Sequence, residues 1–323
     1  MAEGGVLTSR RAVLAMLGLT AAAASACSRR GADAVAAGPM RIASGQEGGV
    51  YFEYGTALAA LVTEDLPQLG TRVLETDAGL ANLALLGERE AEVAFTLADV
   101  AADAFDGGPP FAAPVDLVAL ARLYDNYLHL VVRRDGSIRT VADLRGRRVS
   151  TGPTESGTAL VAGRLLEVAG LAGALDDLDL DLEAAADALT RDEVAAFFFS
   201  GGIPTPAIAG LCDVVDIRLV PLGDLVGRLA DAHGDLYTTA EVPARAYRTD
   251  GAVSTVSVPN YLVVRRDMPQ ELGYALTRLL FTGSATLERA HPAARRLTVR
   301  SAVSTYPLDL HPGAADWYRQ APR

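Results

Sequence analysis

The sequence predicts an α/β protein with a mainly parallel sheet, built as two α/β lobes with a hinge and an interlobe cleft. Three observations support this prediction. From Met40 onward, short β-rich runs alternate with amphipathic helical patterns. A second series of the same kind begins at "RRVSTG". Two similar runs, "YLHLVVRRD" and "VSTVSVPNYLVVRRD", flank the second series and predict two strands in equivalent positions.

The two similar runs give the expected lobe boundaries. Lobe I is predicted to be discontinuous, formed by residues 40–136 and 252–323, and lobe II to be the insert at 137–251. In such folds, ligands bind beyond the carboxyl ends of the strands, where loops lead into helix N-termini. The strand-to-helix loops of both lobes are therefore the places to search for a site.

The first residues have the pattern of an export signal. Ser9-Arg10-Arg11 is a twin-arginine pattern, and the apolar run at 12–24 is too short to span a bilayer. Small residues before Cys27 resemble a bacterial lipobox. Residues 1–27 are thus expected to be a Tat-type lipoprotein signal and 28–39 a tether. Lipid on Cys27 would hold the exported protein at the outer face of the cytoplasmic membrane or in the periplasm, whereas ordinary cleavage nearby would leave Cys27 lost or unmodified.

Composition excludes several classes of function. The chain has 323 residues and a net charge of −11, and its 29 basic residues are all arginine. Without lysine, neither a P-loop nor a Schiff-base enzyme is available. An acidic chain with no basic cluster argues against nucleic acid as a partner. The four histidines are scattered without metal-ligand spacing, so we predict no metal and no cofactor.

The first candidate loop runs from Ser44 to Tyr51. Its glycines are spaced G-x-x-G-G, which is not the dinucleotide fingerprint G-x-G-x-x-G. The amides of Gly48, Gly49 and Val50 are expected to face a ligand at the start of a helix, with Tyr51 as one wall. A plain tight turn with Tyr51 in the core is the alternative.

Three further loops complete the predicted site. Asn82, one turn into a helix, offers both a donor and an acceptor, although it could equally be an idle surface residue. Residues 150–158 place hydroxyls and amides together at a helix start, which suits binding of a carboxylate or another small anion. The alternative is an ordinary N-cap by Thr154 or Ser156, although the hydroxyls are more than a cap needs. In "FFFSGGIPTP" a buried strand runs into a glycine pair. The predicted ligand-binding residues are Ser44, Gly48, Gly49, Val50, Tyr51, Asn82, Thr96, Thr154, Ser156, Gly157, Thr158, Ser200, Gly201 and Gly202.

Catalytic patterns are missing from the sequence. Ser156 does not stand in a G-x-S-x-G elbow, and Cys212 lies in the apolar stretch "AGLCDVVDI" typical of a core residue. An enzyme using either nucleophile would lack a partnered base. We therefore expect a protein that is not an enzyme.

Several segments, in order along the chain, resemble one family. They are "GGVYF", "GLANLALL", "AEVAFTLADVAADAF", "LHLVVRRD…TVADLRGRRVSTG…SGT", "FFFSGGIPTPAI", "VSVPNYLVV" and "LHPGAADWY". They look like the TAXI family of extracytoplasmic solute receptors of tripartite ATP-independent periplasmic (TRAP) transporters, from about Arg41 to Gln320. The resemblance implies a type II periplasmic-binding-protein fold that closes around a small organic anion, such as glutamate, glutamine or a dicarboxylate. It also implies delivery to a multi-span TRAP permease with fused small and large membrane subunits.

The sequence departs from the family pattern at the expected site. Leu97 and Ala98 replace a usual Gln-Ser pair, and Leu80 replaces a common serine. Lost hydrogen-bonding groups favour a less polar or differently shaped carboxylate over glutamate. Arg122 and Arg164 are candidates, by position only, to pair the ligand carboxylate. An ABC-type substrate-binding lipoprotein and a ligand-sensing receptor for a two-component kinase remain the alternative interpretations.

Overall fold

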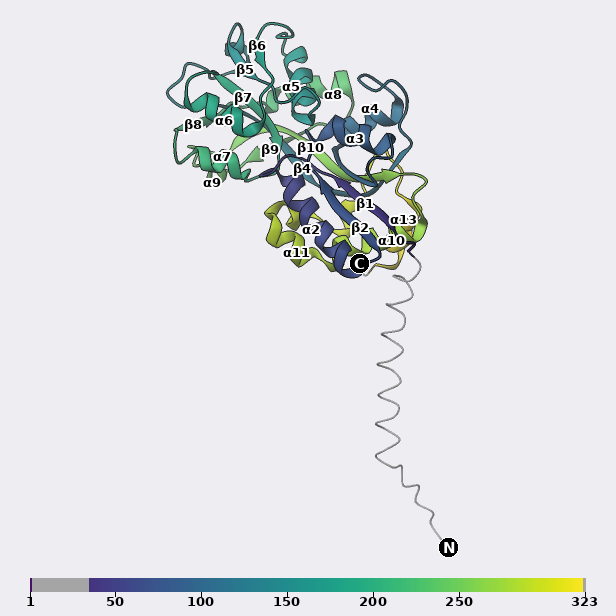
Figure 1. Cartoon of the computed structure of the whole chain (residues 1–323). Coiled ribbons are helices and arrows are strands. Elements are labelled where there is room, and N and C mark those ends of the chain that lie inside the picture. The colour runs from purple at the N-terminus through teal and green to yellow at the C-terminus, as the bar shows by residue number, and fades with distance from the viewer. Residues whose placement is uncertain (2–34, 322–323) are drawn as a thin grey trace.

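The computed structural model describes Met1 and residues 35–321, so the predicted signal, Cys27 and most of the tether lie outside the described residues. A ten-stranded sheet runs through the molecule in the order β2-β1-β3-β10-β4-β7-β5-β6, with β8 paired to β4 and β9 to β10 (Figure 1). The strands are β1 (Gly38–Ala43), β2 (Leu69–Leu74), β3 (Val93–Leu97), β4 (Leu117–Arg133), β5 (Arg148–Ser150), β6 (Asp176–Leu178), β7 (Ala196–Gly201), β8 (Ile217–Leu219), β9 (Thr238–Val242) and β10 (Val253–Arg265).

Helices cover the sheet at both ends of the molecule. They are α2 (Val50–Asp65), α3 (Gly79–Gly87), α4 (Ala98–Asp106), α5 (Gly157–Val168), α6 (Leu182–Thr190), α7 (Pro206–Leu211), α8 (Val226–His233), α9 (Ala244–Tyr247), α10 (Gln270–Thr282), α11 (Ser284–Ala290), α12 (Val299–Ala302) and α13 (Pro312–Gln320), with short 3₁₀ turns at Val141–Leu144, Gly223–Leu225 and Pro292–Arg296. Within the described part of the chain, none of these helices combines the length and apolarity that crossing a membrane requires.

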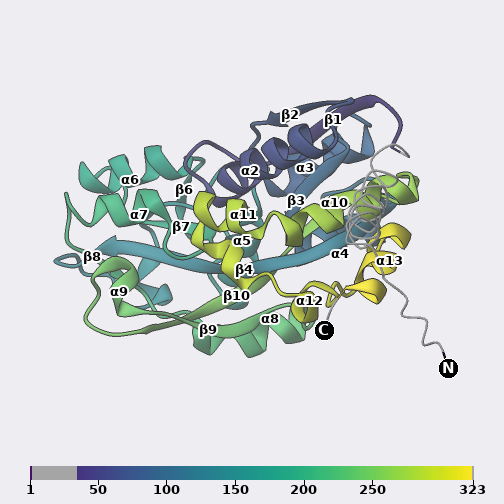
Figure 2. The ribbon, with the colours of Figure 1, turned by 90° about the horizontal axis from the view of Figure 1, so that it is seen from below.

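Two long antiparallel strands, β4 and β10, connect the two ends of the molecule. Figure 2 shows both running along its length, with α6 and α7 toward one end and α10 and α13 toward the other. The first part of β4 pairs with β10, and its last part pairs with β7. Because each strand belongs to both ends, a rotation of one end against the other must bend these two strands. This arrangement agrees with the predicted role of the two similar sequence runs.

The sheet is parallel only toward its two ends. Strands β2, β1 and β3 are parallel to one another, as are β6, β5 and β7. Between these groups, β10 and β4 pair antiparallel with their neighbours. The expectation of a mainly parallel sheet therefore holds for each end, but not for the middle. We call the two ends lobe I and lobe II; their residue boundaries stay a prediction.

One strand is longer than its sequence pattern indicates. The pattern of "DLVALARLYDNYLHLVVRRD" predicts two strand-like runs, but β4 is a single strand over Leu117–Arg133. The polar residues that interrupt its apolar pattern, Asp125 and Asn126, lie in the middle of the strand. Asn126 is buried because its side chain has hydrogen-bonding partners there. The interruption thus marks the position of a polar site, not the end of a strand.

Buried side chains form the contacts between helices and sheet. In lobe I, α2 places Tyr54 and Leu58, both fully buried, against the sheet, and the Tyr54 ring meets Phe95 of β3 edge-on at 5.7 Å. At the far end of lobe I, Phe281 of α10 stacks on Trp317 of α13 with ring centroids 4.5 Å apart. These contacts hold the helices rigidly, so the loops at the sheet edge are well positioned.

Candidate functional site

Four strand-to-helix loops from both lobes surround one cavity. Its volume is about 110 Å³, and the starts of α2, α3 and α5 and the end of β7 contribute to its wall. An apolar cavity of about 150 Å³ holds benzene, so a space of this size accepts roughly four to six non-hydrogen atoms. The sequence predicts these as binding loops because they lead into helix N-termini, and the fold brings them to one place.

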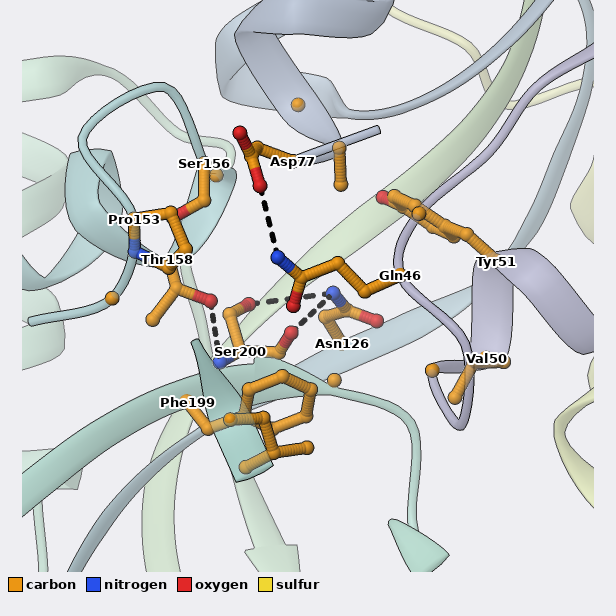
Figure 3. A pocket seen from close by; sticks show the side chains of 18 of the residues that line it. Gln46, Val50, Tyr51, Asp77, Asn126, Pro153, Ser156, Thr158, Phe199 and Ser200 are labelled. Atoms are coloured by element: carbon orange, nitrogen blue, oxygen red, sulfur yellow. Dashed lines mark hydrogen bonds between the residues drawn. The ribbon is translucent and has the colours of Figure 1, made fainter. Parts of the chain in front are cut away.

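Most of the predicted ligand-binding residues line this cavity. They are Gly48, Gly49, Val50, Tyr51, Ser156, Gly157, Thr158, Ser200 and Gly201. Figure 3 shows several of their side chains around a common space. Their contact with a ligand stays a prediction, while their convergence is a property of the fold.

Ser44, Asn82 and Thr96 lie outside the cavity wall. Asn82 is fully buried, and its Nδ2 donates to the carbonyls of Ser44 at 2.6 Å and Phe95 at 2.7 Å. Its Oδ1 accepts from the hydroxyl of Thr76 at 2.6 Å. These bonds tie the first two loops together and leave Asn82 no group for a ligand. Thr96 is likewise fully buried, with its hydroxyl bonded to a backbone carbonyl. The Ser44 hydroxyl donates to the carbonyl of Leu74 at 2.9 Å. Protein groups thus occupy the polar atoms of all three residues, and their contact with a ligand stays a prediction that this geometry does not favour.

Thr154 and Gly202 also lie apart from the cavity. The hydroxyl of Thr154 donates to Asp179 at 2.8 Å, on the outer side of the loop before α5. Gly202 does not line the cavity but lies behind it, where an added Cβ would be 3.3 Å from Val50 and 3.5 Å from Tyr124. A side chain at Gly202 would thus press on two residues of the cavity wall. Gly202 therefore shapes the wall from behind.

Sequence reasoning missed several polar residues that line the cavity. Gln46 lies between Tyr51 and Ser200 in Figure 3, and its Nε2 donates to Asp77 at 2.9 Å. Asn126 of β4 forms part of the floor. Gln46 and Asp77 belong to predicted loops, but the prediction for these loops rested on their glycines and on Asn82, not on these two side chains. The one available signal for Asn126 was a polar residue inside an apolar strand pattern.

A chain of buried hydrogen bonds forms the floor of the cavity. The Tyr51 hydroxyl donates to Asn260 Oδ1, and Asn260 Nδ2 donates to Asn126 Oδ1 at 2.8 Å. Asn126 Nδ2 in turn donates to the carbonyl of Ser200 at 3.1 Å, and the Ser200 amide donates to the Thr158 hydroxyl at 3.1 Å. The chain links α2 through β10 and β4 to β7 and α5. It therefore fixes the polar groups of both lobes relative to one another.

One buried hydroxyl of the wall has no partner in the described part of the chain. Tyr124 of β4 lines the cavity and is 3% exposed, and its hydroxyl makes no hydrogen bond to any described residue. Burial raises the pKa of both Tyr124 and Tyr51 well above the usual value for a phenol. Both hydroxyls therefore stay neutral. A buried hydroxyl without a partner is costly, and a ligand atom could satisfy it.

The cavity wall carries acidic side chains and no basic ones. Glu47, Asp77 and Glu183 line it, and none of the residues lining it is arginine or histidine. Arg122, a candidate from the sequence, lies outside the wall and pairs with Asp125 at 2.6 Å. The idea that Arg122 pairs a ligand carboxylate therefore finds no support in its position.

Arg164, the other candidate, joins the two lobes. Its guanidinium on α5 lies 3.4 Å from Asp99 and 2.6 Å from Asp103, both on α4. The Tyr237 hydroxyl donates to Asp99 at 2.7 Å and accepts from Arg164 at 2.9 Å. Burial alone would lower the pKa of Arg164, but Tyr237 and Asp99 raise it above its ordinary value. Arg164 is thus committed to an interlobe ion pair and does not line the cavity.

Close contacts between the lobes surround the cavity. The Leu80 amide donates to the carbonyl of Glu155 across the cleft at 3.2 Å. A Cβ on Gly79 would lie 2.4 Å from the Gly157 amide nitrogen, and a Cβ on Gly157 would lie 2.7 Å from Leu97 Cδ1. Two glycines therefore allow the lobes to meet. Leu97, which stands where the resembling family has a polar residue, fills the space beside α5, whereas Leu80 lies outside the wall.

Neither candidate nucleophile has the surroundings of a catalytic residue. Ser156 Oγ accepts from the Ala159 amide at 3.1 Å as the N-cap of α5, the single bond that the described residues make to it. Cys212 Sγ donates to the carbonyls of Ile208 at 3.2 Å and Tyr247 at 3.4 Å, and burial raises the pKa of its thiol. A thiol kept protonated is a poor nucleophile.

Comparison with known families identifies the chain at the level of family. A model of the NMT1-like family matches residues 42–321, which includes every loop of the cavity. The chain belongs to the NMT1-like family. The narrower resemblance to the TAXI family stays a prediction, since this match does not distinguish it.

Solved structures similar to this NMT1-like protein have the periplasmic-binding-protein fold. XAC2383 from Xanthomonas citri bound to ATP is 14% identical, with a TM-score of 0.52 over 87% of this chain and 94% of that one. A binding protein component of an ABC phosphonate transporter (PA3383) from Pseudomonas aeruginosa is 11% identical, with a TM-score of 0.50 over 80% and 79%. The periplasmic aliphatic sulphonate binding protein SsuA from Escherichia coli is 18% identical, with a TM-score of 0.49 over 88% and 79%. The predicted fold is confirmed; at these identities the likeness extends to the fold alone.

Proposed function

We propose that this NMT1-like protein is a solute-binding receptor that captures a small organic ligand between its lobes and delivers it to a membrane transporter. The observation that carries the proposal is the cavity at the meeting point of both lobes, lined by the starts of α2 and α5. Family membership and the periplasmic-binding-protein fold support the same function. Non-enzymatic binding fits the surroundings of Ser156 and Cys212.

The ligand is proposed to carry a carboxylate. The first-turn amides of a helix have no intrahelical acceptor, and the helix dipole favours a negative group there. On α5 these are the amides of Gly157 and Thr158, beside the Ser156 and Thr158 hydroxyls. Since the cavity wall holds no basic side chain, the amides and hydroxyls must bind the carboxylate by themselves.

The transporter is proposed to be a TRAP permease of the type that TAXI receptors serve. The ordered sequence motifs support this choice. An ABC importer is the second candidate, because PA3383 is described as the binding protein of an ABC transporter and shares the fold. A ligand-sensing role for a two-component kinase would use the same lobes. Uptake measured in vesicles separates the transporters: an ion gradient suffices for the first, and ATP is required for the second.

Export and lipid attachment at Cys27 belong to the same proposal. A receptor that serves a membrane permease works at the outer face of the cytoplasmic membrane or in the periplasm, and a lipid would keep it near the permease. Intact-mass measurement of the membrane fraction tests the attachment. A Cys27→Ser protein that stays in the membrane fraction, with a mass that differs from wild type only by the exchange of sulfur for oxygen, would contradict it.

A thermal-shift screen of small organic acids, amino acids and amines tests the binding function. A ligand that binds only the folded state at 100 times its Kd stabilises the protein by about 2.7 kcal/mol. We expect stabilisation by one narrow class of small compounds. A broad metabolite screen without any shift would contradict the proposed function.

A further inference from the structure

The charges around the cavity restrict the kind of ligand it can take. Three acidic side chains line the wall: Glu47 from the loop before α2, Asp77 from the loop before α3, and Glu183 from α6. Both lobes contribute, because Glu183 lies across the cleft from Gly48, where an added Cβ would be 3.7 Å from its Oε1. No arginine or histidine lines the wall, and the chain has no lysine. A purely anionic ligand would therefore meet three like charges and no basic side chain.

The part of the cavity at the start of α5 suits a negative group. There the first turn of α5 presents the amides of Gly157 and Thr158, and the Ser156 and Thr158 hydroxyls lie beside them. Each unit charge at about 4 Å through water changes the affinity for a charged ligand by roughly fivefold. An ammonium group near the three carboxylates and a carboxylate near the α5 amides would each increase the affinity of a ligand. A cation without a carboxylate would leave the α5 amides unused.

The space and one buried hydroxyl set further limits. A cavity of about 110 Å³ has room for an amino acid with a very small side chain, given the roughly four to six non-hydrogen atoms it accepts, and a ligand of ten non-hydrogen atoms such as glutamate would extend out of it. Leu97 occupies part of the space that a longer ligand would need. The Tyr124 hydroxyl, buried in the wall without a partner among the described residues, needs an acceptor or donor that only a ligand or a water can bring. A small ligand with polar ends meets these conditions.

We propose that the cavity binds a small zwitterion, with its carboxylate at the α5 amides and its ammonium group facing Glu47, Asp77 and Glu183. The inference rests on the proposed function, and it narrows the ligand from any small organic anion to one that also carries a positive charge. It excludes dicarboxylates and hydroxy acids as preferred ligands. Alanine and glycine are the natural probes of this class.

Calorimetric titration of the full chain with matched probes tests the proposal. L-alanine and lactate have the same number of non-hydrogen atoms and differ by an ammonium group against a hydroxyl. The remaining probes are 2-aminopropan-1-ol, a cation of similar size, and the larger glutamate and succinate. We expect L-alanine to bind at least tenfold more tightly than lactate and than 2-aminopropan-1-ol. If lactate, succinate or glutamate binds as tightly as L-alanine, the zwitterion proposal is wrong while the binding function stands.

Variants of the acidic residues should change the affinities for L-alanine and for lactate in opposite directions. Glu183→Gln and Asp77→Asn should each weaken L-alanine binding about fivefold and strengthen lactate binding. A general loss of structure would weaken both. Glu241→Gln, which removes an exposed acid of β9 away from the cavity, is the matched control and should change neither. Variants that shift both probes in the same direction would overturn the proposal. If neither the probes nor any compound of a broad screen binds, the proposed function itself is wrong. If the screen finds a ligand without an ammonium group, only the zwitterion proposal is wrong.

Discussion

Closure of the lobes depends on the space at Gly157, at the start of α5. In Gly157→Ala the new methyl carbon would lie 2.7 Å from Leu97 Cδ1 in the other lobe. Real carbon atoms do not approach so closely, so either Leu97 moves or the lobes stay apart. Leu97 is 2% exposed and has little freedom to move. The substitution therefore acts mainly on the closed arrangement.

The size of the effect follows from the cost of overpacking. An extra methyl group in a well-packed contact costs about 1–3 kcal/mol. If this cost falls on the closed, ligand-binding state, the apparent affinity falls by roughly 5- to 150-fold. The unfolding free energy of the ligand-free protein should hold steady or rise, because alanine favours a helix over glycine. Calorimetric titration with the compound that the thermal-shift screen finds to bind measures the affinity, and urea unfolding measures the unfolding free energy.

Two further variants determine whether the steric explanation is right. Leu97→Val withdraws the methyl groups that meet residue 157, so adding it to Gly157→Ala should restore most of the lost affinity. Gly163→Ala, on the same helix but with no atom within 4 Å of the new methyl, should leave affinity unchanged. An unchanged affinity in Gly157→Ala, or a double variant as weak as the single one, would refute the reasoning.

Three other predictions concern stability and the ion pair between lobes. Gly273→Ala should lower the unfolding free energy by about 1–3 kcal/mol, since its methyl would lie 2.1 Å from the buried His311 Nδ1. Burial lowers the pKa of His129 to about 4 from 6.5. The unfolded chain therefore binds this proton more readily, and stability falls as pH drops from about 6.5 to 4, by at most about 3 kcal/mol, a slope that His129→Gln should lack. Arg164→Met should destabilise the protein by about 3–5 kcal/mol, because it leaves Asp99 buried without its cation.

Controls and contradicting outcomes differ for these three predictions. Gly227→Ala, with open space around its new methyl, is the control for Gly273→Ala, and equal urea midpoints of the two would contradict the packing argument. For His129, parallel pH profiles of wild type and variant would show that its buried imidazole does not cause the slope. For Arg164, a double-mutant cycle with Asp99→Asn should give a coupling above 1 kcal/mol; additive effects would show that the two side chains act independently.

Much of the fold follows from patterns in the sequence. The apolar pattern after "SGQEGG" predicts a helix from about Val50 to Asp65, and α2 has these bounds. The prolines of "GGIPTP" predict a helix start there, and α7 begins at the last of these residues, Pro206. Such elements are determined by local periodicity and by glycine and proline at their ends. The single strand β4 could not be predicted in this way. Its polar centre is stabilised by β10 and β7, which lie far away in the sequence.

The sequence predicts which loops form the site, but not which side chains of those loops line it. Glycines and hydroxyls at helix starts point to the loops because their amides must have partners or remain exposed. The roles of individual side chains depend on packing between distant segments. Asn82 bonds to backbone groups of two strands, and Arg164 reaches α4 across the cleft. Asp77 and Glu183 come together only when the lobes meet, so the acidic character of the wall could not be read from the sequence.

The most direct test of the central claim is to identify what the protein binds. The purified full chain is denatured, and mass spectrometry then identifies the compound that it releases. One small compound should be detected from wild type, and much less of it from Gly79→Ala. That variant places a Cβ 2.4 Å from the Gly157 amide nitrogen and so opposes closure of the lobes. A bound compound of about six non-hydrogen atoms or fewer is the predicted result. Equal occupancy in wild type and Gly79→Ala would contradict binding between the closed lobes.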